Sequence, residues 1–120
     1  MKELIVINGP MGVGKSTVSE MLLKKYEGAV YLDGDWCWKM NPFIVSEENK
    51  KMVLDNIGYL LRAFLCNSEI NTVIFCWVMQ KEEIFHEIER RLLGCEFHLQ
   101  RFTLECSPQT LEKRLQRDVR

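Results

Sequence analysis

The pattern of hydrophobic and polar positions along this chain predicts four strands. Short apolar runs, in which Val, Ile, Phe and Trp cluster, lie at 2–8, 29–32, 71–78 and 96–106. Runs of this length and composition are typical of strands. The run at 71–78, NTVIFCWV, is continuously apolar, which indicates a strand covered on both faces. The run at 96–106 alternates between apolar and polar residues and predicts a longer strand.

Each strand is followed by a segment whose apolar residues recur at helical spacing. These segments begin near Lys15, Ser46, Lys81 and Ser107, and both serines can serve as N-caps. The second and longest segment has an apolar stripe made of Met52, Val53, Ile57, Leu60, Leu61, Phe64 and Leu65. Strand and helix therefore alternate four times. This order predicts a three-layer α/β/α fold, a parallel sheet between two layers of helices.

Composition and charge narrow the class of protein. At 120 residues, with 47% hydrophobic and 28% charged residues, the chain fits a single globular domain over 1–120. A net charge of −1 gives no reason to expect nucleic acid or an anionic membrane as a partner. No apolar run is long enough for a signal peptide or a membrane span, and the five cysteines are odd in number and lack CxxC spacing. We therefore expect a cytoplasmic protein whose thiols are reduced and buried or half-buried, without disulfide or zinc.

A glycine-rich segment, GPMGVGKST at 9–17, separates the first strand from the first helix. It matches the phosphate-binding pattern G-x-x-x-x-G-K-[ST], in which the lysine meets the β- and γ-phosphates and the hydroxyl ligates Mg²⁺. Glycines let successive backbone N–H groups wrap around an anion, and the helix that follows points its N-terminus at the same anion. The predicted nucleotide-binding residues of this loop are Gly9, Met11, Gly12, Val13, Gly14, Lys15, Ser16 and Thr17. Lys15 is also a catalytic candidate and Ser16 a magnesium ligand. The alternative is a tight glycine turn with an exposed lysine.

An acidic pair, Asp33 and Asp35, follows the second strand directly. Because the C-terminal ends of parallel strands open onto one edge of the sheet, this pair should lie near the phosphate loop. One carboxylate can then hold the Mg²⁺ shell while the other takes the proton from an attacking hydroxyl. The competing interpretation is an acidic turn, since Asp-Gly-Asp is also favourable turn chemistry. A GTPase is disfavoured, because the sequence contains no N-K-x-D segment.

The phosphate loop, the strand ending in Asp-Gly-Asp and a late helix with repeated arginines together carry a family resemblance. The sequence resembles the small P-loop kinases of the shikimate, gluconate and adenylylsulfate kinase type, and chloramphenicol phosphotransferase looks like a relative. The resemblance implies a parallel sheet of strand order 2-3-1-4-5 and transfer of the ATP γ-phosphate to the hydroxyl of a small molecule. It also implies that Asp33 serves magnesium, and that Asp35 touches the acceptor and acts as its base.

The chain ends in LEKRLQRDVR at 111–120, where Arg114, Arg117 and Arg120 share one helical face. In the resembled kinases such a helix leads into a lid over ATP. The resemblance then implies that Arg117 stacks on adenine and that Arg120, a catalytic candidate, reaches the transferring phosphoryl group. The alternative is a solvated charged face. Those kinases continue through the lid to a fifth strand and a final helix, so we expect 1–120 to be a C-terminally incomplete domain that lacks both.

Aromatic residues near the acidic pair predict the acceptor side of the site. Trp36 and Trp77 are the better candidates for its walls, Trp38 and Phe43 are further ones, and Gln80 could hydrogen-bond an acceptor. Such walls favour a flat or apolar acceptor, although the same side chains could simply cover the core. Two other functions stay open. One is a nucleoside monophosphate kinase, which the scarcity of basic residues over 33–80 disfavours, and the other is a nucleotide-binding module without transfer activity. The sequence leaves the oligomeric state open.

Overall fold

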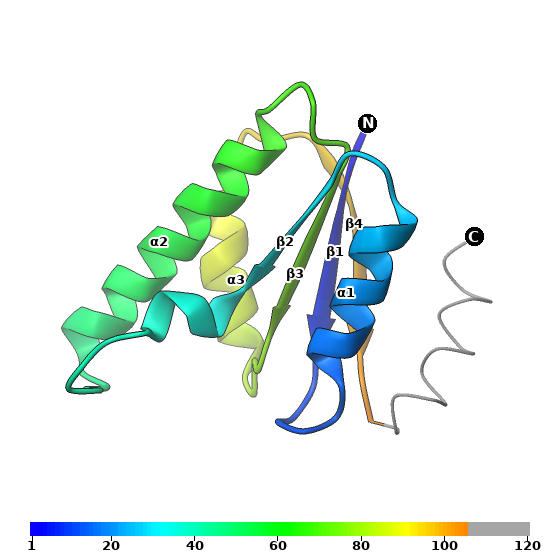
Figure 1. Ribbon diagram of the computed structural model, residues 1–120. Helices are drawn as coiled ribbons and strands as arrows, with labels where there is room; N and C mark the ends of the chain where they lie inside the picture. The colour runs from blue at the N-terminus through cyan, green and yellow to red at the C-terminus, as the bar shows by residue number, and fades with distance from the viewer. Residues whose placement is uncertain (106–120) are drawn as a thin grey trace.

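Four parallel strands form one sheet through the middle of the part of the chain that the structure describes (Figure 1). The structure is a computed structural model that describes residues 1–105, so the predicted helix from Ser107, with Arg114, Arg117 and Arg120, lies outside it. The strands are β1 (Lys2–Asn8), β2 (Ala29–Asp33), β3 (Thr72–Trp77) and β4 (Phe97–Thr103). They are ordered β2-β3-β1-β4, and every neighbouring pair is parallel. This confirms the α/β fold and the first four strands of the implied order.

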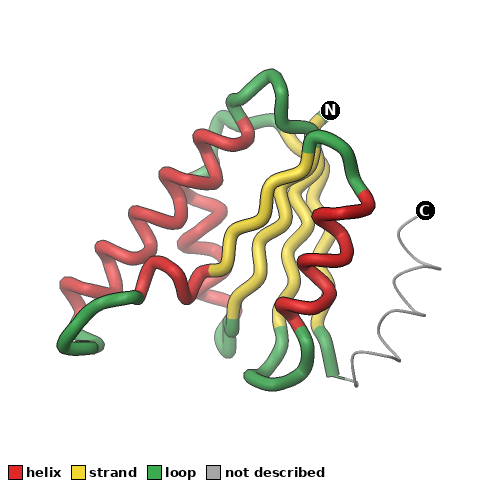
Figure 2. The backbone as a smooth tube through the Cα atoms, viewed as in Figure 1, coloured by secondary structure: helices red, strands yellow, loops and turns green. Residues whose placement is uncertain are grey.

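Helices cover both faces of the sheet (Figure 2). Helix α1 (Lys15–Lys25) packs on one face, and α2 (Glu47–Leu65) and α3 (Glu82–Arg91) pack on the other. Successive side chains of a strand point to opposite faces of the sheet, so the hydrophobic core is divided into two layers. In β1, Leu4 and Val6 face α2 and α3, whereas Ile5 and Ile7 face α1. The continuously apolar run predicted as a doubly covered strand is β3, which is buried from Thr72 to Cys76.

The three helices predicted within residues 1–105 are present, although some predicted details differ. The Ser46 hydroxyl accepts a hydrogen bond from the backbone N–H of Asn49 at 3.1 Å, so Ser46 is the N-cap of α2 as predicted. Met52 is 42% exposed, and its place in the buried stripe of α2 was therefore wrong. Strand β4 ends at Thr103, earlier than the predicted strand at 96–106.

A short 3-10 helix, η1 (Gly34–Trp38), follows β2 and was not predicted. It begins where the Asp33 side chain accepts a hydrogen bond from the backbone N–H of Asp35 at 2.9 Å. The Asp-Gly-Asp turn chemistry thus starts a helical turn instead of a simple loop, and this turn lies against α2 and β3.

Of the cysteines among the described residues, Cys76 is buried, Cys37 and Cys95 are half-buried, and Cys66 is exposed. All are free thiols, as predicted, but the expectation of burial was wrong for Cys66. None of the helices within residues 1–105 has the length and apolar character needed to cross a membrane.

Candidate functional site

The segments that carry the predicted chemistry meet at one edge of the sheet (Figure 1). The glycine-rich loop leaves the C-terminal end of β1, η1 leaves β2, and the segment from Val78 to Gln80 leaves β3. All three strands are parallel, so their C-terminal ends lie side by side. The topology thus brings together residues that are far apart in the sequence.

The glycine-rich loop has a backbone that needs its glycines. Gly9, Gly12 and Gly14 have φ values of 155°, 79° and 98°, in the region that side chains disfavour. A Cβ atom at Gly9 would lie 2.8 Å from the carbonyl oxygen of Leu104. Gly14 is the N-cap of α1, so the loop leads directly into the N-terminus of this helix. Such a loop is suited to cradle an anion.

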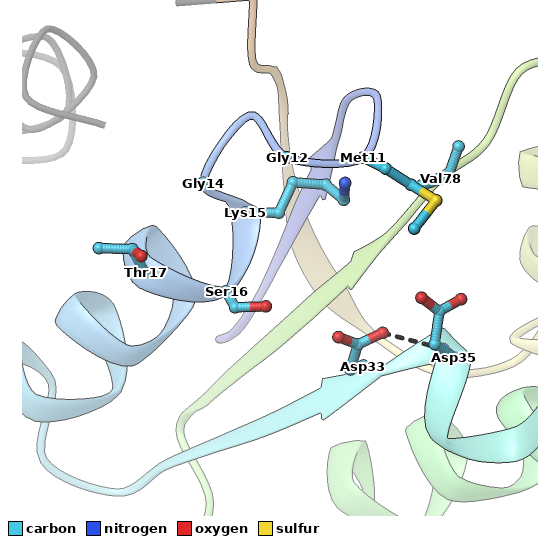
Figure 3. A pocket seen from close by; sticks show the side chains of 9 residues that line it. All are labelled: Met11, Gly12, Gly14, Lys15, Ser16, Thr17, Asp33, Asp35 and Val78. Carbon is cyan, nitrogen blue, oxygen red and sulfur yellow. Dashed lines mark hydrogen bonds between the residues drawn. The ribbon is translucent and has the colours of Figure 1, made fainter. Parts of the chain in front are cut away.

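The ammonium group of Lys15 binds to the backbone of the same loop. Its Nζ donates a hydrogen bond to the carbonyl oxygen of Pro10 at 2.8 Å, and in Figure 3 the side chain lies over the loop. A phosphate in the cradle could replace this carbonyl as the acceptor, because a charged acceptor binds an ammonium group more strongly.

A cavity of about 430 Å³ lies between the loop and the acidic pair. It is lined by Met11, Gly12, Gly14, Lys15, Ser16, Thr17, Asp33, Asp35 and Val78 (Figure 3). The structure therefore brings together the predicted lysine, hydroxyl and both carboxylates. Gly9 and Val13 do not line the cavity, and Val13 packs against the core on the α1 side.

Oxygen ligands suitable for Mg²⁺ lie across this cavity from each other. The Ser16 hydroxyl and the Asp33 carboxylate point toward one another in Figure 3. Within residues 1–105 no group of three or more His, Cys, Asp or Glu side chains could hold a metal by itself. This donor set fits Mg²⁺, which keeps several waters and is usually held by one or two protein ligands together with substrate phosphates.

Two neighbours of these groups, Tyr31 and Cys76, do not line the cavity and are uncharged at pH 7. The Tyr31 hydroxyl and the Cys76 thiol lie 3.3 Å apart. Burial raises the pKa of Tyr31 well above its usual value, and burial raises the pKa of Cys76 to about 11. Cys76 is therefore a neutral thiol at pH 7 and not a nucleophile.

One residue of the site had no role in the sequence interpretation. Asn8, the last residue of β1, accepts hydrogen bonds through Oδ1 from the backbone N–H groups of Gly9 and Met79, both at 2.8 Å. Its Nδ2 donates to the carbonyl oxygen of Met79 at 2.8 Å. Asn8 thus ties the loop after β3 to the phosphate loop. A polar residue that ends an apolar strand just before a glycine was the only available signal.

A second cavity, of about 710 Å³, adjoins the first. It is lined by Met11, Asp35, Trp38, Phe43, Val45, Trp77, Val78 and Gln80, and thus shares Met11, Asp35 and Val78 with the first. Trp77, Trp38, Phe43 and Gln80 lie where the acceptor side was predicted. Trp36 does not line either cavity, because it is 54% exposed and packs against the Tyr31 ring with a centroid distance of 5.1 Å.

Asp35 connects the two cavities and is held by Trp77. The indole Nε1 of Trp77 donates a hydrogen bond to Oδ1 of Asp35 at 3.2 Å. The Trp77 ring lies against Gly34, where an added Cβ would come within 2.4 Å of the ring. The glycine between the two aspartates therefore makes room for the side chain that orients the second one.

Comparisons with known proteins agree with the fold. A family model described as an AAA domain matches residues 5–119. A cytidylate kinase of Buchnera aphidicola subsp. Baizongia pistaciae is 28% identical over 91 residues, which cover 76% of this chain and 39% of that protein. The chain thus matches about two fifths of the length of this relative.

Solved structures of kinases share the fold. An APS kinase of Mycobacterium tuberculosis has a TM-score of 0.65 at 18% identity, with 98% of this chain and 94% of that chain covered. A gluconokinase of Sinorhizobium meliloti has a TM-score of 0.62 at 20% identity, with 97% and 65% covered. These likenesses show the architecture of the fold.

Proposed function

This chain belongs to the AAA domain family and has the fold of small P-loop kinases, and we propose that it transfers the γ-phosphate of ATP to the hydroxyl of a small molecule. One observation carries the proposal. Asp35 lies on both the cavity next to the phosphate loop and the aromatic cavity beside it. A carboxylate in this position can meet an acceptor hydroxyl while ATP phosphates occupy the loop.

In the proposed reaction the loop holds the β- and γ-phosphates through its backbone N–H groups. Lys15 exchanges the Pro10 carbonyl for phosphate oxygens, while Ser16 and Asp33 would hold Mg²⁺. The metal ion supplies neutralisation of the charge that develops on the phosphates. Asp35 accepts the hydroxyl proton as the acceptor oxygen bonds to the γ-phosphorus. The bond from this phosphorus to the β–γ bridging oxygen breaks, and ADP leaves.

Two arginines complete the proposal. Arg117 would stack on the adenine and Arg120 would stabilise charge on the transferring phosphoryl group, as the resemblance implies. Both lie outside the described residues, and the sequence alone supports their roles. The proposal places the reaction in the cytoplasm, where ATP is available and where free thiols such as Cys66 stay reduced.

Two other functions have support. The cytidylate kinase relative favours a nucleoside monophosphate as the acceptor. A nucleotide-binding module without transfer activity would use the same phosphate loop but would not need Asp35. The three functions differ in what happens to the γ-phosphate, which makes them separable in one assay.

The test is transfer of radiolabelled γ-phosphate from ATP to a panel of hydroxyl compounds and nucleoside monophosphates, with and without Mg²⁺. We expect the wild-type chain to phosphorylate at least one compound. Asp35→Asn should lower turnover by about a hundredfold or more, within the range attributed to a positioned base, and should leave ATP affinity within about threefold. Glu69→Gln, an exposed change in the turn before β3, is the matched control and should leave turnover unchanged. A wild-type chain that binds ATP and never transfers its phosphate would instead support the binding module.

A further inference from the structure

We propose that the acceptor is an uncharged hydroxyl compound with a flat aromatic or apolar body, bound in the second cavity. The proposal rests on the transfer function above and names its substrate class. All the residues that line this cavity are apolar except Asp35 and Gln80. Its volume of about 710 Å³ is that of a site for a ligand of drug-like size.

Aromatic rings form two of the walls. Trp38 and Phe43 pack against each other with a centroid distance of 5.6 Å, and Trp77 packs against Phe75 at 6.1 Å. Trp77 also lies against Gly34, and this contact limits the rotation of its ring. A planar apolar group can stack on such rings, whereas a compact polyol offers them little surface.

The mouth of the cavity exposes apolar surface that a ligand would cover. Phe43, Ile44 and Val45 are consecutive and exposed, and Phe43 has 63% of its surface accessible. Phe43 and Val45 both line the cavity. Contiguous exposed apolar residues at the rim of a pocket mark a binding surface. The body of the acceptor would remove this surface from water.

Among the described residues, the lining of the second cavity includes no positively charged side chain that could bind a phosphorylated acceptor. A phosphate group carries nearly two negative charges at pH 7 and is usually bound by Arg, Lys or a nest of backbone N–H groups. The lining contains none of the basic residues of residues 1–105, and its single charged group is the carboxylate of Asp35. Placing a phosphate beside this carboxylate would add repulsion without a compensating partner.

The basic residues of the segment 33–80 are placed elsewhere. Arg62 donates to the carbonyl oxygens of Arg91 at 3.1 Å and Leu93 at 2.9 Å, near the C-terminal end of α3. Lys50 pairs with Glu47 and Lys51 pairs with Asp55 on the surface of α2. The remaining one, Lys39, is exposed and is not part of the cavity lining.

The polar end of the cavity fits a hydroxyl. Oδ1 of Asp35 accepts from Trp77, so Oδ2 is the oxygen available to an acceptor proton. Gln80 adds an amide that can donate and accept. The acceptor would therefore place its hydroxyl at the junction of the two cavities and its apolar body between the tryptophans.

Binding of matched ligand pairs tests the class directly. The 120-residue chain is saturated with Mg²⁺ and a non-hydrolysable ATP analogue, and ligands are followed by calorimetry and by quenching of tryptophan fluorescence. The first pair is cytidine and cytidine monophosphate, which differ by the phosphate. The second pair is a phenyl-substituted propanediol and glycerol, which differ by the aromatic body. We expect the uncharged member of the first pair and the aromatic member of the second to bind about tenfold more tightly or better.

Substitutions of single residues test whether the ligand binds in the second cavity. Phe43→Ala should weaken the phenyl-substituted diol by about fivefold or more. Tyr59→Ala, which removes an exposed aromatic ring from α2 outside both cavities, is the control and should leave this affinity unchanged.

The outcomes separate this inference from the proposed function. Tighter binding of cytidine monophosphate than of cytidine would overturn the substrate class, and its phosphorylation would at the same time support transfer. Failure of both uncharged ligands to bind would also overturn the class. The expected preferences without any transfer of γ-phosphate would support the ligand class and count against the transfer function.

Discussion

At the scale of single residues, the hydrogen bond between Trp77 and Asp35 decides how the proposed base meets its substrate. The indole N–H occupies Oδ1 at 3.2 Å and thereby orients the carboxylate toward the acceptor cavity. A hydrogen bond to a charged group contributes more than one between neutral groups, although Asp35 is exposed and water competes for it. Trp77 is therefore a positioning residue in the proposed reaction.

Replacing Trp77 by Phe tests this role. An aromatic ring stays at the wall of the cavity, although it is smaller than the indole, and the N–H donor is removed. We expect kcat to fall by about fivefold to twentyfold, which corresponds to the loss of one such hydrogen bond, and KM to change by less than about threefold. Trp38→Phe is the matched control, and it should alter KM more than kcat. Equal losses of kcat in the two variants would show that Trp77 only fills space.

Position 34 requires glycine because the Trp77 ring lies against it, and not because of its backbone conformation. Gly34 does not belong to the glycines with positive φ, yet an added Cβ would lie 2.4 Å from Cγ of Trp77. We expect Gly34→Ala to lower the free energy of unfolding by about 1–3 kcal/mol, the usual cost of overpacking. Urea denaturation measures it. In a Trp77→Ala background the same substitution should cost much less, and an unchanged cost there would contradict the proposed clash.

At the scale of elements, the sequence predicted the features that depend on residues close together in the chain. The apolar runs predicted β1 to β4, and Ser46 predicted the start of α2. Lys15, Ser16, Asp33 and Asp35 could be placed together because a motif and the common edge of parallel strands decide their position. The roles of Asn8 and Gly34 could not be predicted, since they depend on contacts with Met79 and Trp77, more than 40 residues away.

Asn8 joins two elements that each contribute to the site. Its side chain makes three hydrogen bonds that hold the loop after β3 against the phosphate loop. Removing it leaves the N–H and the carbonyl of Met79, a buried residue, without these partners. An unsatisfied buried polar group costs about 1–3 kcal/mol.

Two variants of Asn8 separate stability from ATP binding. We expect Asn8→Ala to lower the free energy of unfolding by about 1–3 kcal/mol, measured by urea denaturation. Asn8→Asp keeps the acceptor oxygen and adds a negative charge beside the phosphate loop. It should therefore weaken ATP binding more than Asn8→Ala does, by about tenfold in calorimetry, and this difference should shrink in high salt. An ATP affinity that is equal in both variants at low salt would argue against a phosphate at this loop.

At the scale of the whole molecule, ion pairs on the surface connect α2 to α3 and α3 to the edge strand β4. Arg91 of α3 pairs with Asp55 of α2 and with Glu87. Arg101 of β4 pairs with Glu82 of α3 at 2.6 Å, and its guanidinium lies 3.8 Å from the centroid of the Phe85 ring. These contacts reach from helix to helix and from helix to strand, so their charge state should affect the cohesion of the fold.

The carboxyl groups of these contacts have depressed pKa values. Hydrogen bonds from Arg101 lower the pKa of Glu82, hydrogen bonds from Lys51 and Arg91 lower that of Asp55, and a hydrogen bond from Arg91 lowers that of Glu87. Burial acts to raise the pKa of Glu3, but hydrogen bonds from His98 and Gln100 outweigh it and the net shift is downward. All four groups thus bind protons less readily in the folded chain than in the unfolded chain.

The sign of the pH dependence follows from these shifts. A carboxyl whose pKa is lower when folded adds stability that is fully present above its unfolded value, 4.5 for Glu and 3.8 for Asp, and that is lost as the pH falls through the folded value. We therefore expect the urea midpoint to stay level from pH 7 to about pH 5 and to fall progressively below it. Because these pairs are solvent-exposed, the fall should be smaller in high salt.

Arg101→Met tests which contact contributes to this acid dependence. Met keeps an unbranched apolar side chain that can pack on Phe85, but it removes the charge beside Glu82. The difference between the urea midpoints at pH 7 and pH 3 should be smaller than in the wild type, because the pKa of Glu82 then returns toward its ordinary value. Lys24→Met removes the same charge from an exposed position on α1 and should leave the difference unchanged. A midpoint difference that is reduced equally in both variants would assign the acid dependence to net charge and not to the pair between α3 and β4.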